Sequence, residues 1–310
     1  MNKEIKELDL IIIGGGPAGL TAAMYAGRAK LNTLLLEDKI VGGQVRNSYI
    51  IENYPGFKSI TGGELSDLLQ AQAEEFGAVI DEFDVIEDIK LSHDEKIIET
   101  ETYIYKPKAV IIATGASPKK LPVPQENKFS GNGVHYCAIC DGAIYEGKKI
   151  AVVGGGNSAL EEAIFLTKFA EKVYLIRRYD YFKGEKTKME AVFNHPKIEV
   201  MLNEDIIELQ GDNTLERIIL KNTKSDEIRE MNIDAVFGYI GTKPKTELVK
   251  QYLKLNEYGY IITDEGMRTN IEGVYAAGDV RQKEFRQITT AVSDGTIALL
   301  NAEKYILSKE

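Results

Sequence analysis

Two cysteines, separated by two residues, are the most reactive feature of this sequence. Cys137 and Cys140 stand in the run CAIC and are the only cysteines of the 310 residues. A structural zinc site needs four Cys or His ligands, and the three histidines, His93, His135 and His195, supply no second ligand pair. Two unrelated buried thiols explain this spacing poorly. The pair therefore predicts a dithiol/disulfide centre, in which the cysteines bond to each other, and no metal.

Asp141 directly follows the cysteine pair. In a CxxC segment a neighbouring turn or helix can lower the pKa of one thiol, so that it attacks as a thiolate. A carboxyl at this position could carry the proton that dithiol chemistry gains and loses. An acidic residue at a helix start is the alternative, with comparable weight.

The elements around these residues contain one unit twice. In residues 8–37 the apolar run LDLIII enters GGGPAGL, the helical stretch TAAMYAGRAK follows and TLLLE closes the unit. In residues 149–178 KIAVV enters GGGNSAL, followed by the helical stretch EEAIFLTKFA and by VYLIRR. A Gly-rich turn between a strand and a helix is a dinucleotide fingerprint. Two copies make a Gly-rich turn without a nucleotide a weak alternative.

The glycines of each fingerprint have separate tasks. Gly14 and Gly154 permit the tight turn, while Gly16 and Gly156 let the backbone approach a pyrophosphate at a helix N-terminus. The residues that begin each helix complete the predicted cofactor contacts: Pro17, Ala18, Asn157 and Ser158.

The ends of the two second strands predict different ligands. An acidic residue about 20 positions beyond the glycines takes ribose hydroxyls, and Glu37 stands there in the first copy. The same position of the second copy holds Arg177, followed by Arg178. A carboxylate suits a free 2′-hydroxyl and guanidinium groups suit a 2′-phosphate. The first site thus fits FAD and the second NADPH, unless the arginines are only solvated residues at a strand end.

Two further strands run into small-residue turns that can approach a nucleotide. These are IIATGASP at 111–118 and GVYAAGDV at 273–280. Asp279 could hold a ribityl hydroxyl, or it could cap a turn or helix. The predicted contacts from these turns are Ala113, Thr114, Gly115, Gly278 and Asp279.

Composition limits the class of protein. The chain has 48 acidic and 38 basic residues, a net charge of -10, which argues against a nucleic-acid partner. Its length and its 44% hydrophobic residues suit a globular protein of two domains. The uncharged stretch 10–27 is interrupted by glycines and a proline, so we expect neither a signal peptide nor a membrane span, and a cytoplasmic location.

The motifs together resemble those of low-molecular-weight thioredoxin reductases, nearly end to end. They are GGGPAGL at 14–20, GGQ at 42–44, ENYPG at 52–56, ATG at 113–115, CAICDG at 137–142, GGGNSALEEA at 154–163, and AAGDV and RQ within 276–287. The resemblance implies an α/β fold of two Rossmann-like, three-layer ββα nucleotide-binding domains, the second inserted into the first. It implies a discontinuous FAD-binding domain at 1–115 and 247–310, and a nicotinamide-type domain at 116–246 that carries CxxC.

The resemblance also implies roles for individual residues. Cys140 would lie against the flavin, Cys137 would attack the disulfide of thioredoxin, and Asp141 would be the acid/base. The protein would be a homodimer whose domains alternate between two orientations. FAD would be held by Glu37, Gly43, Gln44, Asn53 and Asp279, with Arg286 and Gln287 near the flavin and the nucleotide path.

One departure concerns the electron donor. NADPH-using members carry a His-Arg-Arg run and another Arg four residues later, where this chain has Arg177, Arg178, Tyr179 and Lys183. Tyr179 lacks the planar guanidinium that grips a 2′-phosphate. A subgroup of similar, clostridial-looking reductases takes electrons from ferredoxin. Because GGGNSA at 154–159 is intact while the basic cluster is only partly kept, NADPH is the favoured donor and ferredoxin its competitor.

Two other classes remain as alternatives. Ferredoxin/flavodoxin NADP reductases share a similar scaffold but typically lack CxxC. A flavin-bound redox sensor that signals through its disulfide would differ only in slow turnover.

Overall fold

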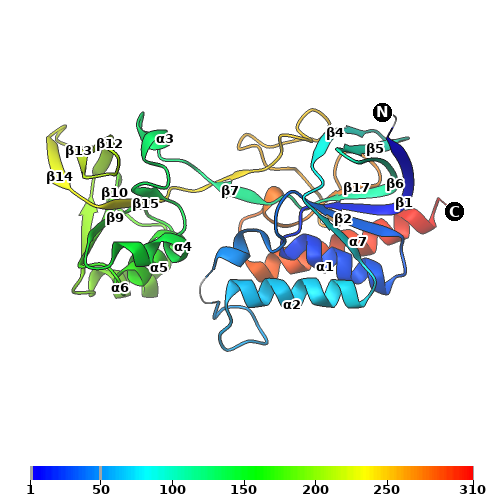
Figure 1. Ribbon diagram of the computed structural model, residues 1–310, viewed down its shortest axis with the longest axis horizontal. Helices are drawn as coiled ribbons and strands as arrows, with labels where there is room; N and C mark the ends of the chain where they lie inside the picture. Colours follow the sequence, from blue (N-terminus) through cyan, green and yellow to red (C-terminus); the bar gives the residue numbers. More distant parts are fainter. Residues whose placement is uncertain (1–2, 49–50, 310) are drawn as a thin grey trace. The chain divides into compact units, whose positions relative to one another are not determined.

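The structure is a computed structural model that describes residues 3–48 and 51–309, with the backbone but not the side chain of Cys140. The chain divides into two compact units, drawn in Figure 1. Unit 1 comprises Met1–Ser117 and Lys243–Glu310, and unit 2 comprises Pro118–Thr242.

Unit 1 is built on a central sheet with a parallel core. Strand β1 pairs in parallel with β2 and β6, β2 pairs with β3, and β17 pairs with β6. Strands β4 and β5 continue the sheet in antiparallel fashion. The strands are β1 (Glu4–Ile13), β2 (Thr33–Glu37), β3 (Val79–Glu82), β4 (Ile86–Leu91), β5 (Lys96–Thr100), β6 (Tyr103–Ile112) and β17 (Val274–Ala276).

Three long helices cover one face of this sheet, as Figure 1 shows. They are α1 (Pro17–Arg28), α2 (Gly62–Glu75) and α7 (Ile288–Leu307), and α1 contacts both of the others. Two short 3-10 helices, η1 (Gly43–Asn47) and η3 (Gly278–Val280), lie in the connections. The apolar run of β1 is buried on both faces: Leu10 and Ile12 face the helices, whereas Ile11 and Ile13 join a second core with Val249 and Ile261.

The two chain segments that cross between the units pair with each other. Strand β7 (Ala116–Pro118) and strand β16 (Thr242–Pro244) form a two-stranded sheet. Backbone hydrogen bonds at both ends of this pair join Lys119 to Gly241, at 2.8 Å, and Lys245 to Gly115, at 3.0 Å.

Unit 2 contains a parallel sheet in the order β11-β10-β9-β15-β8 and an antiparallel sheet β12-β13-β14. The parallel strands are β8 (Val134–His135), β9 (Lys149–Gly154), β10 (Lys172–Arg177), β11 (Ile198–Leu202) and β15 (Ala235–Tyr239). The antiparallel strands are β12 (Glu204–Gln210), β13 (Arg217–Asn222) and β14 (Ile228–Asn232). The helices are α3 (Glu126–Phe129), α4 (Ala138–Asp141), η2 (Gly142–Tyr145), α5 (Asn157–Leu166) and α6 (Lys186–Phe193).

The parallel sheet of unit 2 lies between two apolar cores. Ile150 and Val152 pack with residues of α5, whereas Ala151 packs with residues of the antiparallel sheet such as Ile218. Alternate residues of one strand thus face a helix layer and a second sheet, which is a three-layer ββα arrangement. The predicted α/β class with two Rossmann-like sheets is confirmed.

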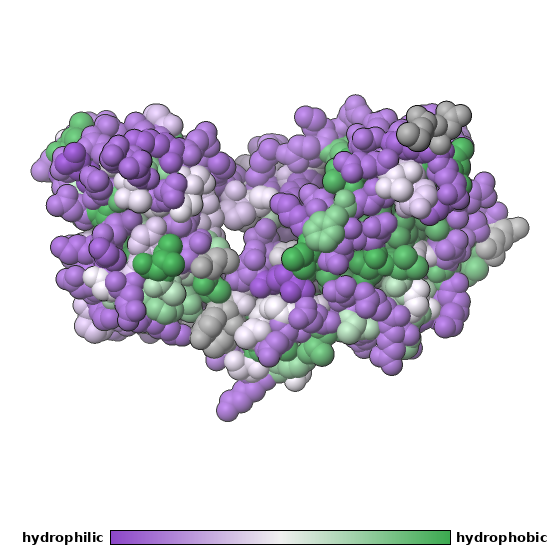
Figure 2. Space-filling model, in the orientation of Figure 1, coloured by the Kyte–Doolittle hydropathy of each residue, from purple (hydrophilic) through white to green (hydrophobic). Residues whose placement is uncertain are grey.

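The surface is mainly polar. Figure 2 shows a largely hydrophilic face with a green hydrophobic area on unit 1. Within residues 3–48 and 51–309, no helix combines the length and apolar character that crossing a bilayer requires.

Candidate active site

The first fingerprint turn lies at the carboxyl edge of the unit 1 sheet. Gly14 has φ 108°, in the region that favours glycine, and a Cβ there would meet the carbonyl of Ala113 after β6. A Cβ on Gly19 would collide with the carbonyl oxygen of Gly14. Gly16 caps α1, and no atom lies within 4 Å of the position its Cβ would take. The open space at this helix N-terminus suits a pyrophosphate.

Glu37 ends β2 beside this turn. Its Oε2 accepts a hydrogen bond from the Gly15 amide at 2.7 Å. Burial and a hydrogen bond with Asp38 raise the pKa of Glu37, while the same hydrogen bond lowers the pKa of Asp38. A carboxyl at this position can accept hydrogen bonds from ribose hydroxyls.

A cavity of about 180 Å³ opens next to Glu37. Apolar side chains and several polar groups form its wall, as in many small-molecule sites. The lining residues are Ile13, Gly14, Leu36, Glu37, Asp38, Asp84, Val85, Ile86, Thr114, Lys245, Glu247 and Leu248. Thr114 donates a hydrogen bond to the Lys245 carbonyl at 2.6 Å, which fixes the turn after β6 against this wall.

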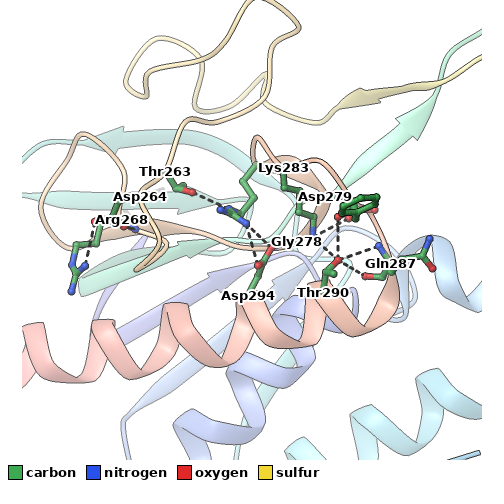
Figure 3. A network of polar contacts seen from close by, with 11 residues as sticks. Thr263, Asp264, Arg268, Gly278, Asp279, Lys283, Gln287, Thr290 and Asp294 are labelled. Carbon is green, nitrogen blue, oxygen red and sulfur yellow. Dashed lines mark hydrogen bonds and ion pairs between the residues drawn. The ribbon is translucent and has the colours of Figure 1, made fainter. Parts of the chain in front are cut away.

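Asp279 lies in a second polar region of unit 1, shown in Figure 3. Its Oδ1 is buried and accepts no hydrogen bond, although the Lys283 ammonium lies 3.5 Å away. Burial raises the pKa of Asp279 against the opposing effect of Lys283. Gly278 has φ 77°, and a Cβ there would lie 2.9 Å from the Cβ of Ala18 in α1. An unsatisfied acceptor next to the fingerprint helix fits a ligand hydroxyl.

The other predicted FAD contacts also belong to unit 1. A Cβ on Gly43 would lie 3.2 Å from Gly16 Cα, so η1 with Gln44 begins next to the fingerprint. The Asn53 amide donates to Gln287 Oε1 at 3.2 Å, and Gln287 caps α7. The Arg286 guanidinium lies over the Tyr260 ring, 4.0 Å from its centroid, and its Nε is buried without a partner.

The second fingerprint has the same construction in unit 2. Gly154 ends β9, Gly156 caps α5, and the position of a Gly156 Cβ is again open. Asn157 Oδ1 accepts from the Glu185 amide at 2.7 Å, and its Nδ2 donates to Glu185 Oε1 at 2.8 Å. Ser158 follows in the first turn of α5.

The two arginines at the end of β10 already have partners. Arg177 donates from Nε to the Tyr181 carbonyl at 3.1 Å and lies over the Tyr179 ring, 4.7 Å from its centroid. The same guanidinium group would meet a Cβ on Gly155, so it lies against the fingerprint turn. Arg178 forms an ion pair of 2.7 Å with Asp205.

The cysteine segment lies in unit 2, between β8 and η2. Cys137 is disulfide-bonded, and no described cysteine is a free thiol. The Tyr239 hydroxyl accepts a hydrogen bond from the Ala138 amide at 2.9 Å, at the start of α4. Burial, followed by the charge of Glu162, raises the pKa of Tyr239. Asp141 is the last residue of α4 and the N-cap of η2, where its side chain makes no capping hydrogen bond.

Comparisons with known proteins agree with this geometry. The family model described as pyridine nucleotide-disulphide oxidoreductase matches residues 8–295. A 34.2 kDa protein in the rubredoxin operon of Clostridium pasteurianum is 55% identical, over 99% of this chain and 100% of that protein. The thioredoxin reductase of Peptoclostridium acidaminophilum is 44% identical, over 96% of each. The crystal structure of Lactococcus lactis thioredoxin reductase has a TM-score of 0.93 and 42% identity, and covers 97% of this chain and 99% of that one.

The chain belongs to the pyridine nucleotide-disulphide oxidoreductase family. The resemblance found in the motifs is confirmed, and the chain is an FAD-dependent oxidoreductase of the thioredoxin reductase type. The residues of unit 1 fit FAD, because an open helix N-terminus, a carboxyl at the end of β2 and the unsatisfied oxygen of Asp279 supply three kinds of contact that the cofactor needs.

Several residues of this oxidoreductase were not found from the sequence. His135, Tyr145 and Tyr239 surround the cysteine segment, and Lys283 and Asp294 lie beside Asp279. The first three stand close to the CAIC run or at the end of a strand, and this position was the sequence feature by which they could have been predicted. Lys283 stands four residues after Asp279, whereas Asp294 stands 15 residues after it and lies there because α7 packs beside η3.

Proposed function

We propose that the chain is a thioredoxin-disulfide reductase that passes electrons from NADPH through FAD to the disulfide of Cys137, and then to oxidised thioredoxin. In this proposal residues 1–115 and 247–310 form the FAD-binding domain, and residues 116–246 form the nicotinamide-type domain. The observation that carries it is a disulfide-bonded cysteine in the same unit as one dinucleotide fingerprint, in a chain whose other unit carries the second.

The proposed role of the protein is to hold the reacting groups and manage protons. FAD, when bound and reduced, would supply an electron pair to the disulfide. Uptake of two protons then completes two thiols. Cys137, as a thiolate, attacks a thioredoxin sulfur and forms a mixed disulfide; Cys140 displaces reduced thioredoxin and restores the internal disulfide. Asp141 gives and removes the protons of these steps.

The identity of the electron donor is a separate part of the proposal. Arg177 and Arg178 support NADPH, because both lie at the end of β10 where a 2′-phosphate is read. The ion pair of Arg178 with Asp205 and the presence of Tyr179 weaken this clamp, since a bound phosphate must compete with a carboxylate. These observations keep ferredoxin as the second candidate donor.

Anaerobic titration of the holoprotein with NADPH, NADH and reduced ferredoxin, followed by flavin bleaching, tests the donor. We expect NADPH to reduce the flavin at the lowest concentration. Arg178→Ala should weaken NADPH binding about tenfold and NADH binding less, because only NADPH has the phosphate. Equal effects on both nucleotides would refute the 2′-phosphate role. If reduced ferredoxin alone bleached the flavin, ferredoxin and not NADPH would be the electron donor.

The cysteine assignment has a separate test. Cys140→Ser should abolish thioredoxin reduction but retain bound FAD, since the CAIC segment belongs to unit 2 and the first fingerprint to unit 1. Absorbance of the flavin and reduction of thioredoxin are measured on the same sample. Loss of FAD from this variant would contradict the assignment of the sites. Size-exclusion chromatography tests the proposed homodimer.

A further inference from the structure

A buried histidine joins the cysteine segment to its neighbouring aromatic residues. His135, at the end of β8, is 4% exposed. Its Nδ1 lies 3.1 Å from Asp141 Oδ2, and its Nε2 lies 2.7 Å from the Tyr145 hydroxyl. The ring is stacked on Phe237, with 5.2 Å between centroids and an interplanar angle of 27°. Three contacts therefore fix the orientation of this imidazole.

The contacts require a defined tautomer. An ionised carboxylate only accepts hydrogen bonds, so Nδ1 carries the proton that points to Asp141. In the neutral ring Nε2 then accepts the Tyr145 hydroxyl proton. Burial lowers the pKa of His135, against the opposing charge of Asp141, which keeps the ring neutral near pH 7. The Asp141 carboxylate is therefore held by a donor that is itself held by Tyr145.

We propose that His135, oriented by Tyr145, is a positioning residue that holds the Asp141 carboxylate beside the CAIC segment. The inference rests on the proposed function, in which Asp141 exchanges protons with the dithiol. Asp141 is 34% exposed by side chain, and without a buried partner its carboxylate would sample several rotamers in solvent. In the transfer step the thiol proton moves to the carboxylate, leaving a thiolate and a neutral carboxyl, so charge and protons balance. A fixed acceptor makes this step faster.

Other titratable groups face the same region, so the test must separate their effects from that of His135. Tyr145 has a pKa raised by burial, then by the charges of Asp141 and Asp234. Tyr239 contacts the start of α4, and the pKa of Glu162 is raised to about 7 by burial and by Glu161. A pH profile near neutrality could therefore come from Glu162, and each histidine variant is also measured in a Glu162→Gln background.

The experiment compares variants of the holoprotein in thioredoxin reduction across pH. His135→Phe keeps a ring for stacking on Phe237 but removes both polar contacts. His135→Asn keeps an amide donor for Asp141, and Tyr145→Phe removes only the outer hydroxyl. His195→Asn is the matched control, because His195 bonds Thr167 at 3.3 Å and lies outside the cysteine segment.

We expect His135→Phe to lower kcat about tenfold at neutral pH, with KM unchanged and with an altered pH profile. His135→Asn should restore most of this loss, Tyr145→Phe should lose about threefold, and His195→Asn should resemble the parent. The rate at which iodoacetamide alkylates the chemically reduced holoprotein should rank the variants in the same order as kcat does. The proposal is overturned if His135→Phe matches His195→Asn, or if the Asn and Phe variants are equally impaired.

A reference variant separates this inference from the function on which it rests. If Asp141→Asn loses activity but His135→Phe does not, only the positioning role fails. If Asp141→Asn equals the parent protein, the assigned acid/base fails as well. Alkylation needs no thioredoxin, so it reports on the dithiol even if another protein is the true acceptor. Flavin absorbance and circular dichroism identify any variant that does not fold, and Tyr145→Phe then carries the test.

Discussion

Asp294 is the residue that holds the charged groups beside Asp279 together. It accepts hydrogen bonds from the Gly278 amide and the Lys283 ammonium, both at 3.1 Å, and from the Arg281 guanidinium at 3.2 Å. The Asp294 and Lys283 side chains are each 8% exposed. Figure 3 shows that these groups converge on one side of α7. Asp294 thus compensates the charge of Arg281 and shares that of Lys283 with Asp279.

Asp294→Ala should therefore lower the free energy of unfolding by about 3 kcal/mol, because it leaves the largely buried Arg281 guanidinium without a carboxylate and Lys283 with Asp279 alone. Asp264→Ala is the control in the same figure: Asp264 pairs with Arg268, but both are more than half exposed, so the loss should stay below about 1 kcal/mol. Urea unfolding of both variants measures the difference. Equal losses would contradict the idea that burial decides the value of these pairs.

Glu162 should make stability depend on pH. Its folded pKa is raised from 4.5 to about 7, mainly by burial and secondly by Glu161. The folded state therefore holds a proton that the unfolded state releases between pH 4.5 and 7, and this contribution to stability is lost as pH rises through that window. Glu162→Gln should be more stable than the parent at pH 8, with no such gain at pH 4.5, in urea unfolding. Glu171→Gln, at an exposed site, is the control, and an equal gain there would refute the argument.

At the scale of single residues, the sequence predicted those whose role follows from their type and from the spacing of nearby residues. Glu37 was predicted because it ends a strand about 20 residues after the fingerprint glycines, and Asp279 because it follows a strand and a glycine. Asp294 and Tyr239 were not, because their partners are distant in sequence: Gly278 stands 16 residues from Asp294, and Ala138 stands 101 residues from Tyr239. Arg178 was predicted to bind phosphate, but its contact with Asp205 depends on the pairing of strands that no motif encodes.

Gly19 and Gly63 lie near the start of two helices of unit 1, and of these two only Gly19 is needed as a glycine. Gly19 lies inside α1, where a Cβ would collide with the Gly14 carbonyl of the preceding turn. Gly63 lies inside α2, where a Cβ would meet nothing within 4 Å. One helix thus needs glycine for close packing on a turn, and the other does not need it.

Gly19→Ala should displace the fingerprint turn, weaken FAD binding at least about tenfold and destabilise the chain by more than about 1 kcal/mol. Gly63→Ala should instead stabilise it by up to about 1 kcal/mol, because alanine is the better helix former. Flavin retention during gel filtration and thermal unfolding provide the two measurements. Retention of FAD by Gly19→Ala would show that the turn can move without cost.

The helices themselves were predicted with shifted bounds. The expected helical stretch at 21–30 is observed as Pro17–Arg28, and the stretch at 161–170 as Asn157–Leu166. Glycine and proline signal a turn in sequence, yet Pro17 occupies the first helical position, where its missing amide proton costs nothing. The C-terminal shift in the first copy follows from Lys30, whose φ of 60° lies outside the helical region.

At the scale of the whole molecule, the sequence predicted two related βαβ units because their turns repeat. It did not predict from periodicity alone where the chain leaves unit 1 and returns; that expectation came from the family resemblance. The antiparallel β12-β13-β14 layer was also absent from the motif analysis, since short alternating strands carry no fingerprint. Its core residues, such as Ile218 and Leu220, are fully buried against the parallel sheet.

Because β7 and β16 pair with each other, an experiment can test whether unit 1 folds without unit 2. Because β7 and β16 are hydrogen-bonded neighbours, the chain leaves and re-enters unit 1 at points about 5 Å apart. Replacing residues 118–242 by a short glycine linker should therefore leave unit 1 able to close its sheet, bind FAD and unfold cooperatively, since its cores are formed from its own residues. This shortened protein should be yellow but unable to reduce thioredoxin, as should full-length Cys140→Ser. A colourless or unfolded product would mean that the FAD-binding residues of unit 1 do not suffice, and the proposed division of the cofactor sites between the two units would fall.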